Sequence, residues 1–323
     1  MLIPRKTLLL SLILAFGGHL NANAADLVVG DQSYSARTVM EASGVLKDLP
    51  YSLEWKQFTA GSPVAEALNA GSLDVGLLGD APVLFLGALG APIKVVGVTR
   101  QNLDGVAIVV PRDSPIKTLA DLKGRKVAIW KGSWSQQLML TALDKAGVAR
   151  DAVDYRYLSA LDASHALDGG SVDAIATWDP YVTQQERQGS RILTTAKGLI
   201  PAQSFIVAND KSIKDKRAQI SDFLQRLQAA RAWSVSNAQN TDTYATAWAG
   251  LTKADAEVAR LWFARSQIVI VPVTAQVIAG AQQTIDFFSG TGLTKSYPAD
   301  KVFDQSFSQV LETQGQAGAQ VSR

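Results

Sequence analysis

A sixteen-residue segment occurs twice in this chain, 99 positions apart, and constrains the fold more than any other feature. The copies are residues 66–81 and 165–180. They share six identical pairs, which are Ala67/Ala166, Leu68/Leu167, Gly71/Gly170, Ser72/Ser171, Asp74/Asp173 and Asp80/Asp179. Each copy has the order of a helix end, a glycine, a short apolar strand and an Asp before the next helix. Because a strand followed by a helix is the unit of a parallel α/β sheet, the repeat predicts two similar α/β lobes.

Within each copy, the glycine and the last Asp have specific predicted roles. Gly71 and Gly170 suit a left-handed helix end. Asp80 and Asp179 suit helix N-caps, which accept hydrogen bonds from otherwise unpaired amides. Ligands of open α/β sheets bind beyond the carboxyl ends of the strands. The two Asp-led helix starts are therefore expected to face one shared cleft.

The pattern of apolar segments sets the expected domain organisation. Strands are predicted at 27–30, 53–58, 75–78, 93–98 and 106–110, then at 126–130, 155–158, 172–177 and 204–208, with helices between many of them and a mainly helical stretch over 214–288. Hinges are predicted at Val110–Pro111 and near Ser204, so lobe I would comprise 25–109 and 204–312, and lobe II 110–203. A Gln/Gly/Ala-rich tail over 313–323 is predicted to be flexible.

The first 24 residues have the features of a secretory signal peptide. Arg5 and Lys6 precede a short apolar run, and Ala22-Asn23-Ala24 fits the small-residue cleavage rule. Cleavage after Ala24 and a periplasmic location are predicted. A retained anchor is the alternative, but the apolar run is short for a bilayer span.

Composition excludes several classes of function. The chain has no cysteine, which removes disulfides, thiol nucleophiles and a lipidated tether. Loss of the signal peptide removes two basic residues and leaves 29 basic against 29 acidic ones, so no nucleic-acid partner is expected. His165 becomes the only histidine, and no phosphate-binding or metal motif is present in the sequence. No cofactor and no metal are predicted.

Four predicted helix starts carry the residues best suited to bind an anion. Helix N-termini offer free amides and partial positive charge, serine hydroxyls add donors, and Gly79 and Gly132 allow close approach of the backbone. The candidate ligand-binding residues are Gln32, Ser33, Gly79, Asp80, Ala81, Gly132, Ser133, Trp134, Ser135, Trp178, Asp179 and Tyr181.

Alternatives stay open for several of these residues. Trp134, Trp178 and Tyr181 either wall an organic ligand or pack between lobes. Lys131 and Arg37 either add positive charge to the site or lie on the surface, solvated or in ion pairs.

The two Asp residues would repel an anion. They therefore either cap helices only, or one of them binds an amine or hydroxyl of the ligand.

Several segments resemble the aliphatic sulfonate-binding proteins of ABC importers. They are residues 114–128, Lys131-Gly132-Ser133, Trp178-Asp179-Pro180-Tyr181, Glu66-Ala67-Leu68-Asn69, Gly79-Asp80-Ala81-Pro82, 272–274 and 282–288. The resemblance implies an α/β fold of the type II periplasmic binding proteins, two lobes joined by two crossings. It also implies a small organic oxyanion as ligand, above all an alkane- or arylsulfonate, delivered to a cognate permease of the inner membrane by a monomer without catalysis. Trp134 replaces the small polar residue usual in that family.

Other functions remain compatible with the sequence. Taurine, a sulfate ester or nitrate are alternative ligands. A desulfinase-like enzyme on the same scaffold is a second class, although the thiol nucleophile expected there is missing. A ligand-sensing or partner-docking domain without transport is a third.

Overall fold

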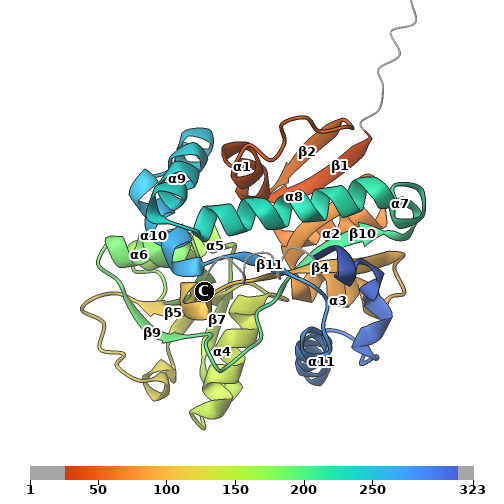
Figure 1. Ribbon diagram of the computed structural model, residues 1–323. Coiled ribbons are helices and arrows are strands. Elements are labelled where there is room, and N and C mark those ends of the chain that lie inside the picture. The colour runs from red at the N-terminus through yellow and green to blue at the C-terminus, as the bar shows by residue number, and fades with distance from the viewer. Residues whose placement is uncertain (1–25, 312–323) are drawn as a thin grey trace, which may run out of the picture.

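The computed structural model describes residues 26–311 and folds them into two α/β lobes (Figure 1). The predicted signal peptide and the predicted tail over 313–323 lie outside the described residues. Lobe I begins with β1 (Leu27–Gln32), α1 (Ser35–Ala42), β2 (Leu53–Phe58), α2 (Gly61–Asn69), β3 (Val75–Gly79), α3 (Asp80–Ala88) and β4 (Ile93–Arg100). Lobe II contains β5 (Val106–Val110), β6 (Lys126–Ile129), α4 (Trp134–Lys145), β7 (Asp154–Tyr157), α5 (Ala160–Asp168), β8 (Ala174–Trp178), α6 (Tyr181–Arg187) and β9 (Arg191–Thr195).

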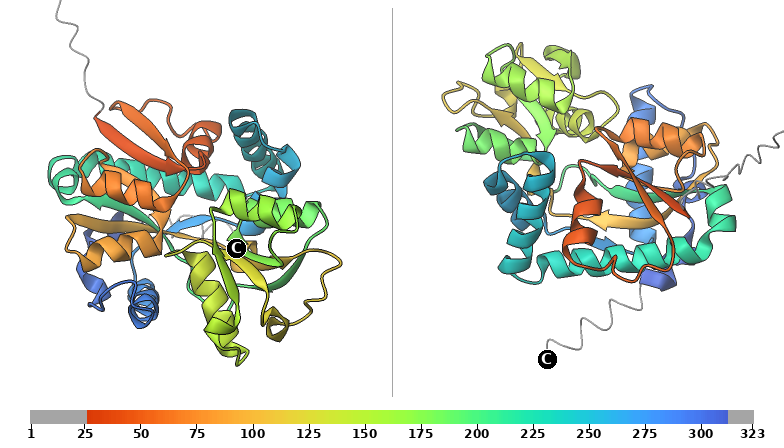
Figure 2. Two further views of the ribbon diagram at one scale, coloured as in Figure 1. Left: turned by 180° about the vertical axis from the view of Figure 1, so that it is seen from behind. Right: turned by 90° about the horizontal axis from the view of Figure 1, so that it is seen from above.

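The chain then returns to lobe I and remains there. This part contains β10 (Ser204–Asn209), α7 (Asp210–Asp215), α8 (Arg217–Val235), α9 (Ala238–Thr252), α10 (Ala256–Ser266), β11 (Val269–Val271) and α11 (Ala275–Gly290). The predicted helical stretch is confirmed, except that β11 interrupts it. Figure 2 shows the yellow-green lobe II set beside the orange and red strands of lobe I.

The two sheets have the same internal arrangement. In lobe I the strand order is β11-β4-β10-β3-β1-β2, and in lobe II it is β7-β6-β8-β5-β9. β3 pairs in parallel with β1 and antiparallel with β10, and β8 pairs in parallel with β6 and antiparallel with β5. The two copies of the sequence repeat therefore end in equivalent central strands. The prediction of two similar α/β lobes is confirmed.

Each sheet is covered by apolar side chains on both faces. In lobe I, Leu27 and Val29 of β1 pack toward α1 and α8, whereas Leu78 of β3 packs toward α2, α3 and α11. All five residues of β5 in lobe II are buried. Strands covered on both faces are continuous apolar runs, which is why the sequence pattern located them well.

Two crossings connect the lobes, and one of them differs from the prediction. β5 pairs with β8 and β9 along its whole length, so it belongs to lobe II. The first crossing is therefore residues 101–105, and the predicted hinge at Val110–Pro111 and a lobe I limit at 109 are wrong. The sequence of an apolar strand that ends at a proline does not indicate which sheet the strand joins. The second crossing leads into β10, which pairs with β3 and β4 of lobe I from Ser204 onward.

Side chains of the two lobes meet on both sides of the crossings. On one side, Trp134 of α4 donates to Asp80 of α3, with Nε1 2.9 Å from Oδ1. On the other, Arg265 of α10 binds Glu186 of α6. Arg187 of α6 also lies 3.7 Å from Asp255 and 3.8 Å from Glu257 in lobe I. These contacts hold the lobes in a closed arrangement.

Candidate ligand-binding cavity between the lobes

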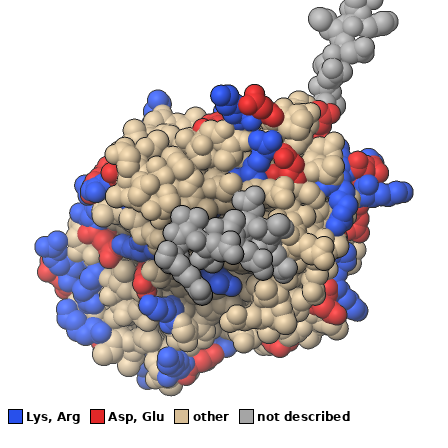
Figure 3. All heavy atoms as spheres, viewed as in Figure 1, with Lys and Arg blue, Asp and Glu red and all other residues tan. Residues whose placement is uncertain are grey.

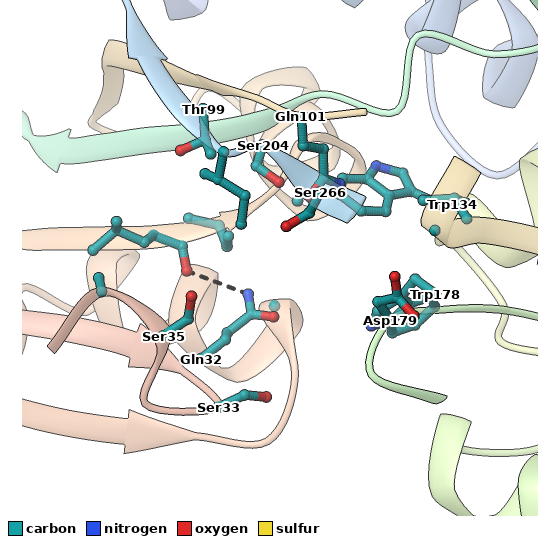
Figure 4. Close-up of a pocket in the computed structure, with 18 of the residues that line it drawn as sticks. Gln32, Ser33, Ser35, Thr99, Gln101, Trp134, Trp178, Asp179, Ser204 and Ser266 are labelled. Carbon is teal, nitrogen blue, oxygen red and sulfur yellow. Dashed lines mark hydrogen bonds between the residues drawn. The ribbon is translucent and has the colours of Figure 1, made fainter. Parts of the chain in front are cut away.

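A cavity of about 200 Å³ lies between the two lobes, next to both crossings. Its lobe I wall includes Gln32, Ser33, Ser35, Gly79 and Ala81, and its lobe II wall includes Ser133, Trp134, Trp178 and Asp179. Figure 4 shows Gln32, Ser33 and Ser35 on one side of the space and Trp178 and Asp179 on the other. The cavity lies where an open α/β sheet is expected to bind a ligand, at the carboxyl ends of its parallel strands.

Residues from four helix starts line this cavity, two from each lobe. Ser35 and Ala36 begin α1, and Gly79 precedes α3. Ser133 and Trp134 begin α4, and Asp179 precedes α6 by two residues. The first amides of a helix have no intrahelical partner and carry partial positive charge. The cavity can therefore stabilise negative charge with backbone groups.

The α1 start is shaped by an unusual turn. Ser33 and Tyr34 both have positive φ, 53° and 59°, and together they turn the chain from β1 into the helix. The turn brings both Ser33 and Ser35 to the cavity wall. Two hydroxyls next to a helix start add donors at this point of the site.

Arg231 of α8 supplies the guanidinium that lines the cavity. It is only 4% exposed, and it donates from Nη2 to Ser35 Oγ at 2.9 Å and from Nη1 to Tyr244 Oη at 3.0 Å. Its Nε has no hydrogen-bond partner. A buried guanidinium with a free donor is suited to pair with an anion.

Asp31 of β1 is a buried acid in the same wall. Its Oδ2 accepts from the backbone N–H of Arg37 at 2.9 Å. Burial raises the pKa of Asp31 to about 6, although the Arg37 amide and the Arg231 charge oppose the shift. Asp31 and Arg231 thus offset each other in charge, and protonation of Asp31 would leave the positive charge in excess.

Asp179 has one occupied and one unoccupied carboxylate oxygen. Oδ1 accepts from the Thr183 backbone N–H at 2.9 Å and from Thr183 Oγ1 at 2.7 Å. Oδ2 has no hydrogen-bond partner, although Arg265 Nη1 lies 3.8 Å away. Burial raises the pKa of Asp179, while the Thr183 hydrogen bond and the Arg265 charge oppose that shift. Asp179 therefore accepts from an amide in the first turn of α6, but the N-cap is Pro180, so the predicted N-cap position of Asp179 is wrong by one residue.

Asp80 does not occupy the N-cap position of α3. Gly79 is the N-cap, and Asp80 is the first helical residue, fully buried. Its carboxylate accepts from the Ala81 backbone N–H at 2.8 Å, Trp134 Nε1 at 2.9 Å and Thr284 Oγ1 at 3.2 Å. Burial raises the pKa of Asp80 to about 6 against these hydrogen bonds. The N-cap prediction fails because Trp134 and Thr284, distant in sequence, recruit this carboxylate.

Eight of the twelve predicted residues line the cavity and four do not. Those that line it are Gln32, Ser33, Gly79, Ala81, Ser133, Trp134, Trp178 and Asp179. Those that do not are Asp80, Gly132, Ser135 and Tyr181. Ser135 is fully buried and donates to the Ala176 carbonyl at 2.6 Å. Gly132 packs against Phe85, so that a Cβ there would lie 2.8 Å from the ring.

Of the two alternatives for Arg37 and Lys131, the structure supports a position on the surface for both residues. Arg37 forms an ion pair with Glu41 at 2.8 Å, with about a third of its side chain exposed. Lys131 is exposed and does not line the cavity. Neither supplies charge to the site in this arrangement.

Sequence reasoning missed the contribution of the C-terminal helices. Arg231 of α8 and Trp262 and Ser266 of α10 line the cavity, although they follow the repeat by many residues. One signal was available: Arg231 shares the buried stripe of α8 with Leu224 and Leu227, at the spacing of one helix face. An arginine on an apolar stripe indicates a buried partner or a ligand.

Three tryptophans give the cavity an aromatic wall. Trp134 and Trp178 come from lobe II, with their ring centroids 6.4 Å apart and nearly perpendicular. Trp262 comes from α10. Large rigid rings provide apolar area for an organic group at little cost in side-chain entropy.

Within residues 26–311, no group of three or more His, Asp or Glu side chains is placed to hold a metal ion. None of the helices in that range is long and apolar enough to cross a membrane. On the face drawn in Figure 3, basic and acidic side chains of the described residues are intermixed. The site is thus defined by the cavity and not by a surface charge field.

Two α/β lobes around a polar and aromatic cavity define a two-lobed solute-binding protein. Residues 51–241 match the family model described as NMT1/THI5 like. An aliphatic sulfonate-binding protein of Escherichia coli strain K12 is 37% identical over 266 residues, covering 81% of this chain and 83% of that protein. The chain therefore belongs to the NMT1/THI5-like family, among the aliphatic sulfonate-binding proteins with the periplasmic binding protein fold.

Solved structures agree with this assignment. The periplasmic aliphatic sulphonate-binding protein SsuA of Escherichia coli superposes with a TM-score of 0.80 at 34% identity, covering 86% of this chain and 92% of that one. The alkanesulfonate-binding protein SsuA of Xanthomonas axonopodis pv. citri, bound to MOPS, has a TM-score of 0.78 at 29% identity, covering 86% and 97%. Both of these solved structures, like the curated relative above, are named as binding proteins.

Proposed function

We propose that this chain is the periplasmic solute-binding component of an ABC importer and that it captures an organosulfonate in the interlobe cavity. The observation that carries the proposal is the meeting of four helix starts, two serines and the Arg231 guanidinium at one cavity between the lobes. A sulfonate presents three acceptor oxygens and one negative charge. Backbone amides, hydroxyls and a guanidinium are the donors that such a group requires.

The anionic end of the ligand would lie at the α1 start. Ser33, Ser35 and Arg231 line the cavity there, and no other guanidinium or ammonium group of the described residues lines it. Asp31 opposes the binding of an anion while it is ionised. Its raised pKa makes protonation on binding accessible, so the Asp31–Arg231 pair can turn net positive when an anion arrives.

The organic tail would contact the tryptophans. Trp134, Trp178 and Trp262 line the cavity, and a volume of about 200 Å³ is several times the roughly 30 Å³ that one water occupies in the liquid. Sulfate or nitrate would leave the aromatic wall in contact with water. A sulfonate with an alkyl or aryl tail would replace that water, so organosulfonates are favoured over inorganic oxyanions.

Delivery follows from the same architecture. Closure of two lobes around a ligand gives a permease a means to distinguish loaded from empty protein. We propose that the chain is secreted with cleavage after Ala24, acts as a monomer and delivers its ligand to a cognate permease in the inner membrane. Mass spectrometry of the secreted protein would then give Ala25 as the first residue.

A ligand panel tests the function. Thermal unfolding and calorimetry of the mature chain would be measured with butanesulfonate, benzenesulfonate, a phenyl sulfate ester, sulfate and nitrate. Organosulfonates at about 100 times their dissociation constant should add about 2.7 kcal/mol to the free energy of unfolding. Sulfate and nitrate should add far less. No shift with any sulfonate, or a shift only with inorganic anions, would contradict the proposal.

A double variant tests the anion end. Arg231→Met alone would leave Asp31 buried without its countercharge, so it is combined with Asp31→Asn. The pair removes both charges and keeps the site neutral. We expect at least about a tenfold loss of sulfonate affinity with an unchanged circular dichroism spectrum, because a charge-assisted hydrogen bond is lost.

A further inference from the structure

The turn that leads into α1 has a backbone conformation that ordinary side chains disfavour. Ser33 and Tyr34 have φ of 53° and 59°, and neither is a glycine. Two successive residues in the left-handed region cost free energy in a chain of L-residues, so such a turn persists only where the surrounding structure fixes it. The contacts that fix it also decide where the hydroxyls of Ser33 and Ser35, which line the cavity, are placed.

Strand β2 holds the amides of this turn. The backbone N–H of Ser33 donates to the Phe58 carbonyl at 3.3 Å, and the backbone N–H of Tyr34 donates to Gln57 Oε1 at 3.1 Å. The side chain of Tyr34, at the N-cap position of α1, makes no capping hydrogen bond. The sheet therefore fixes the donors of the turn, and its carbonyl groups need partners from another element.

Trp248 of α9 binds the carbonyl at the centre of the turn. Its Nε1 donates to the Ser33 carbonyl oxygen at 2.6 Å, across 215 positions of sequence. This carbonyl and the Tyr34 N–H belong to one peptide unit, so Trp248 and Gln57 hold the two ends of the same peptide. The plane of that peptide cannot rotate without loss of both hydrogen bonds. Trp248 is 4% exposed and does not itself line the cavity.

The indole of Trp248 is held in place by an aromatic cluster between α9 and α10. Its ring lies 5.3 Å from Trp262 and 5.9 Å from Phe263, nearly perpendicular to both. One turn earlier on α9, Tyr244 stacks on Phe263 and donates from Oη to the Ser35 carbonyl at 3.0 Å. Helices α1 and α9 pack in one apolar cluster and lie side by side (Figure 1). One face of α9 thus binds two carbonyls at the α1 start.

We propose that Trp248 is a positioning residue for ligand binding, whose indole N–H holds the left-handed turn so that the hydroxyls of Ser33 and Ser35 face the cavity. This inference rests on the proposed function, because those hydroxyls serve binding only where the anionic group of the ligand lies at the α1 start. Preorganised donors bind more tightly than donors that must first be ordered. Helix α9 thus contributes to affinity through a residue that does not touch the ligand.

Removal of the indole donor tests the inference. Trp248→Phe keeps an aromatic ring in the cluster, and benzothienylalanine at position 248 keeps the two-ring shape and lacks only the N–H. Each should weaken butanesulfonate binding about fivefold in calorimetry, with an unchanged circular dichroism spectrum. The matched control is Trp55→Phe, because Trp55 packs against Phe223 in lobe I and does not line the cavity. The control should lower the midpoint of thermal unfolding and leave the affinity unchanged.

A double-mutant cycle separates positioning from a general loosening of lobe I. The benzothienylalanine replacement is repeated in a chain that carries Ser33→Ala and Ser35→Ala, where no hydroxyl remains to be positioned. It should then change butanesulfonate affinity less than about twofold. An equal loss in both backgrounds, or unchanged affinity when only the N–H of Trp248 is removed, would overturn the inference and leave the proposed function standing. If the unaltered chain binds no sulfonate, both fail.

Discussion

The two copies of the sequence repeat fold alike through most of their length and differ at their last residue. Gly71 and Gly170 end their helices with φ of 71° and 68°. Asp74 and Asp173 each accept from a backbone N–H of the parallel neighbouring strand, at 2.8 Å in both lobes. The shared residues before the helix start therefore perform the same scaffold task twice, as the sequence predicted for the glycines.

The final Asp of each copy has a different role. Asp80 is fully buried, binds side chains of both lobes and does not line the cavity. Asp179 lines the cavity and keeps one oxygen without a partner. The difference arises from the neighbours: Trp134 and Thr284 donate to Asp80, whereas Thr183 donates to one oxygen of Asp179 and Gly105 packs closely against the other. Equivalent positions in duplicated lobes thus keep their backbone task and diverge in what their side chains bind.

Alanine at the two positions should separate these roles most strongly. Asp80→Ala leaves the buried Trp134 and Thr284 donors without an acceptor and should lower the free energy of unfolding by about 3 kcal/mol. Asp179→Ala removes the cap to Thr183 and the 3.8 Å contact with Arg265, and should cost about 1 kcal/mol. Urea unfolding of both variants measures the difference. Equal losses would mean that the two carboxylates contribute alike to the fold.

Asp80 should also make stability depend on pH. Burial raises its pKa to about 6 in the folded state from an ordinary value of 3.8, so the folded chain binds a proton that the unfolded chain has released. The free energy of unfolding should therefore fall as pH rises between about 4 and about 6, by roughly 2 kcal/mol from this group. Asp80→Asn should remove that part of the slope. Asp31, with a pKa likewise raised to about 6, adds a contribution of the same sign that stays in the variant. An identical slope in Asp80→Asn and the unaltered chain would show that folding does not raise the pKa of Asp80.

The hydrogen bond from Trp134 to Asp80 should favour the closed arrangement that encloses a ligand. Trp134→Phe keeps an aromatic ring in the wall and removes the donor. We expect butanesulfonate affinity to fall about fivefold, close to 1 kcal/mol. Trp178→Phe is the matched control, a similar ring exchange at the Asp179 copy, and should change affinity less. Calorimetry gives the butanesulfonate affinity of both variants. A larger loss in Trp178→Phe than in Trp134→Phe would show that the hydrogen bond to Asp80 does not favour the closed arrangement.

The smallest effect is expected at the glycines, where the copies are alike. Gly71→Ala and Gly170→Ala each force a side chain into a left-handed backbone conformation, and no other atoms lie within 4 Å of the new Cβ. Each should cost about 0.5–1 kcal/mol in thermal unfolding and leave sulfonate binding unchanged. A clear difference between them would show that the two helix ends are not equivalent.

Local pattern was enough to predict most of the fold. The strands at 53–58 and 75–78 were located to within a residue of β2 and β3, the first from its alternation of apolar and polar residues and the second from its continuous apolar run. Sheet membership was harder to read. β5 is as apolar as its neighbours in sequence, and only its pairing with β8 and β9 shows that the hinge precedes it.

The site was predictable only where a motif marks it. The helix starts that follow strands were recognisable, and most of their predicted residues line the cavity. Asp31 and Arg231 were missed because neither belongs to a helix-start motif, and α8 reaches the cavity only through packing beside α1. Whether Asp80 or Asp179 lines the cavity depended on the distant Trp134, Thr284 and Gly105, which no local pattern connects to them.

The central claim is that an organosulfonate lies between the lobes with its anionic group at the α1 start. A crystal structure of the complex with butanesulfonate tests it most directly. The account predicts sulfonate oxygens within hydrogen-bond distance of Ser33, Ser35 or Arg231. A sulfonate bound outside the interlobe cavity, or bound inside it with its oxygens against Asp179, would contradict the account.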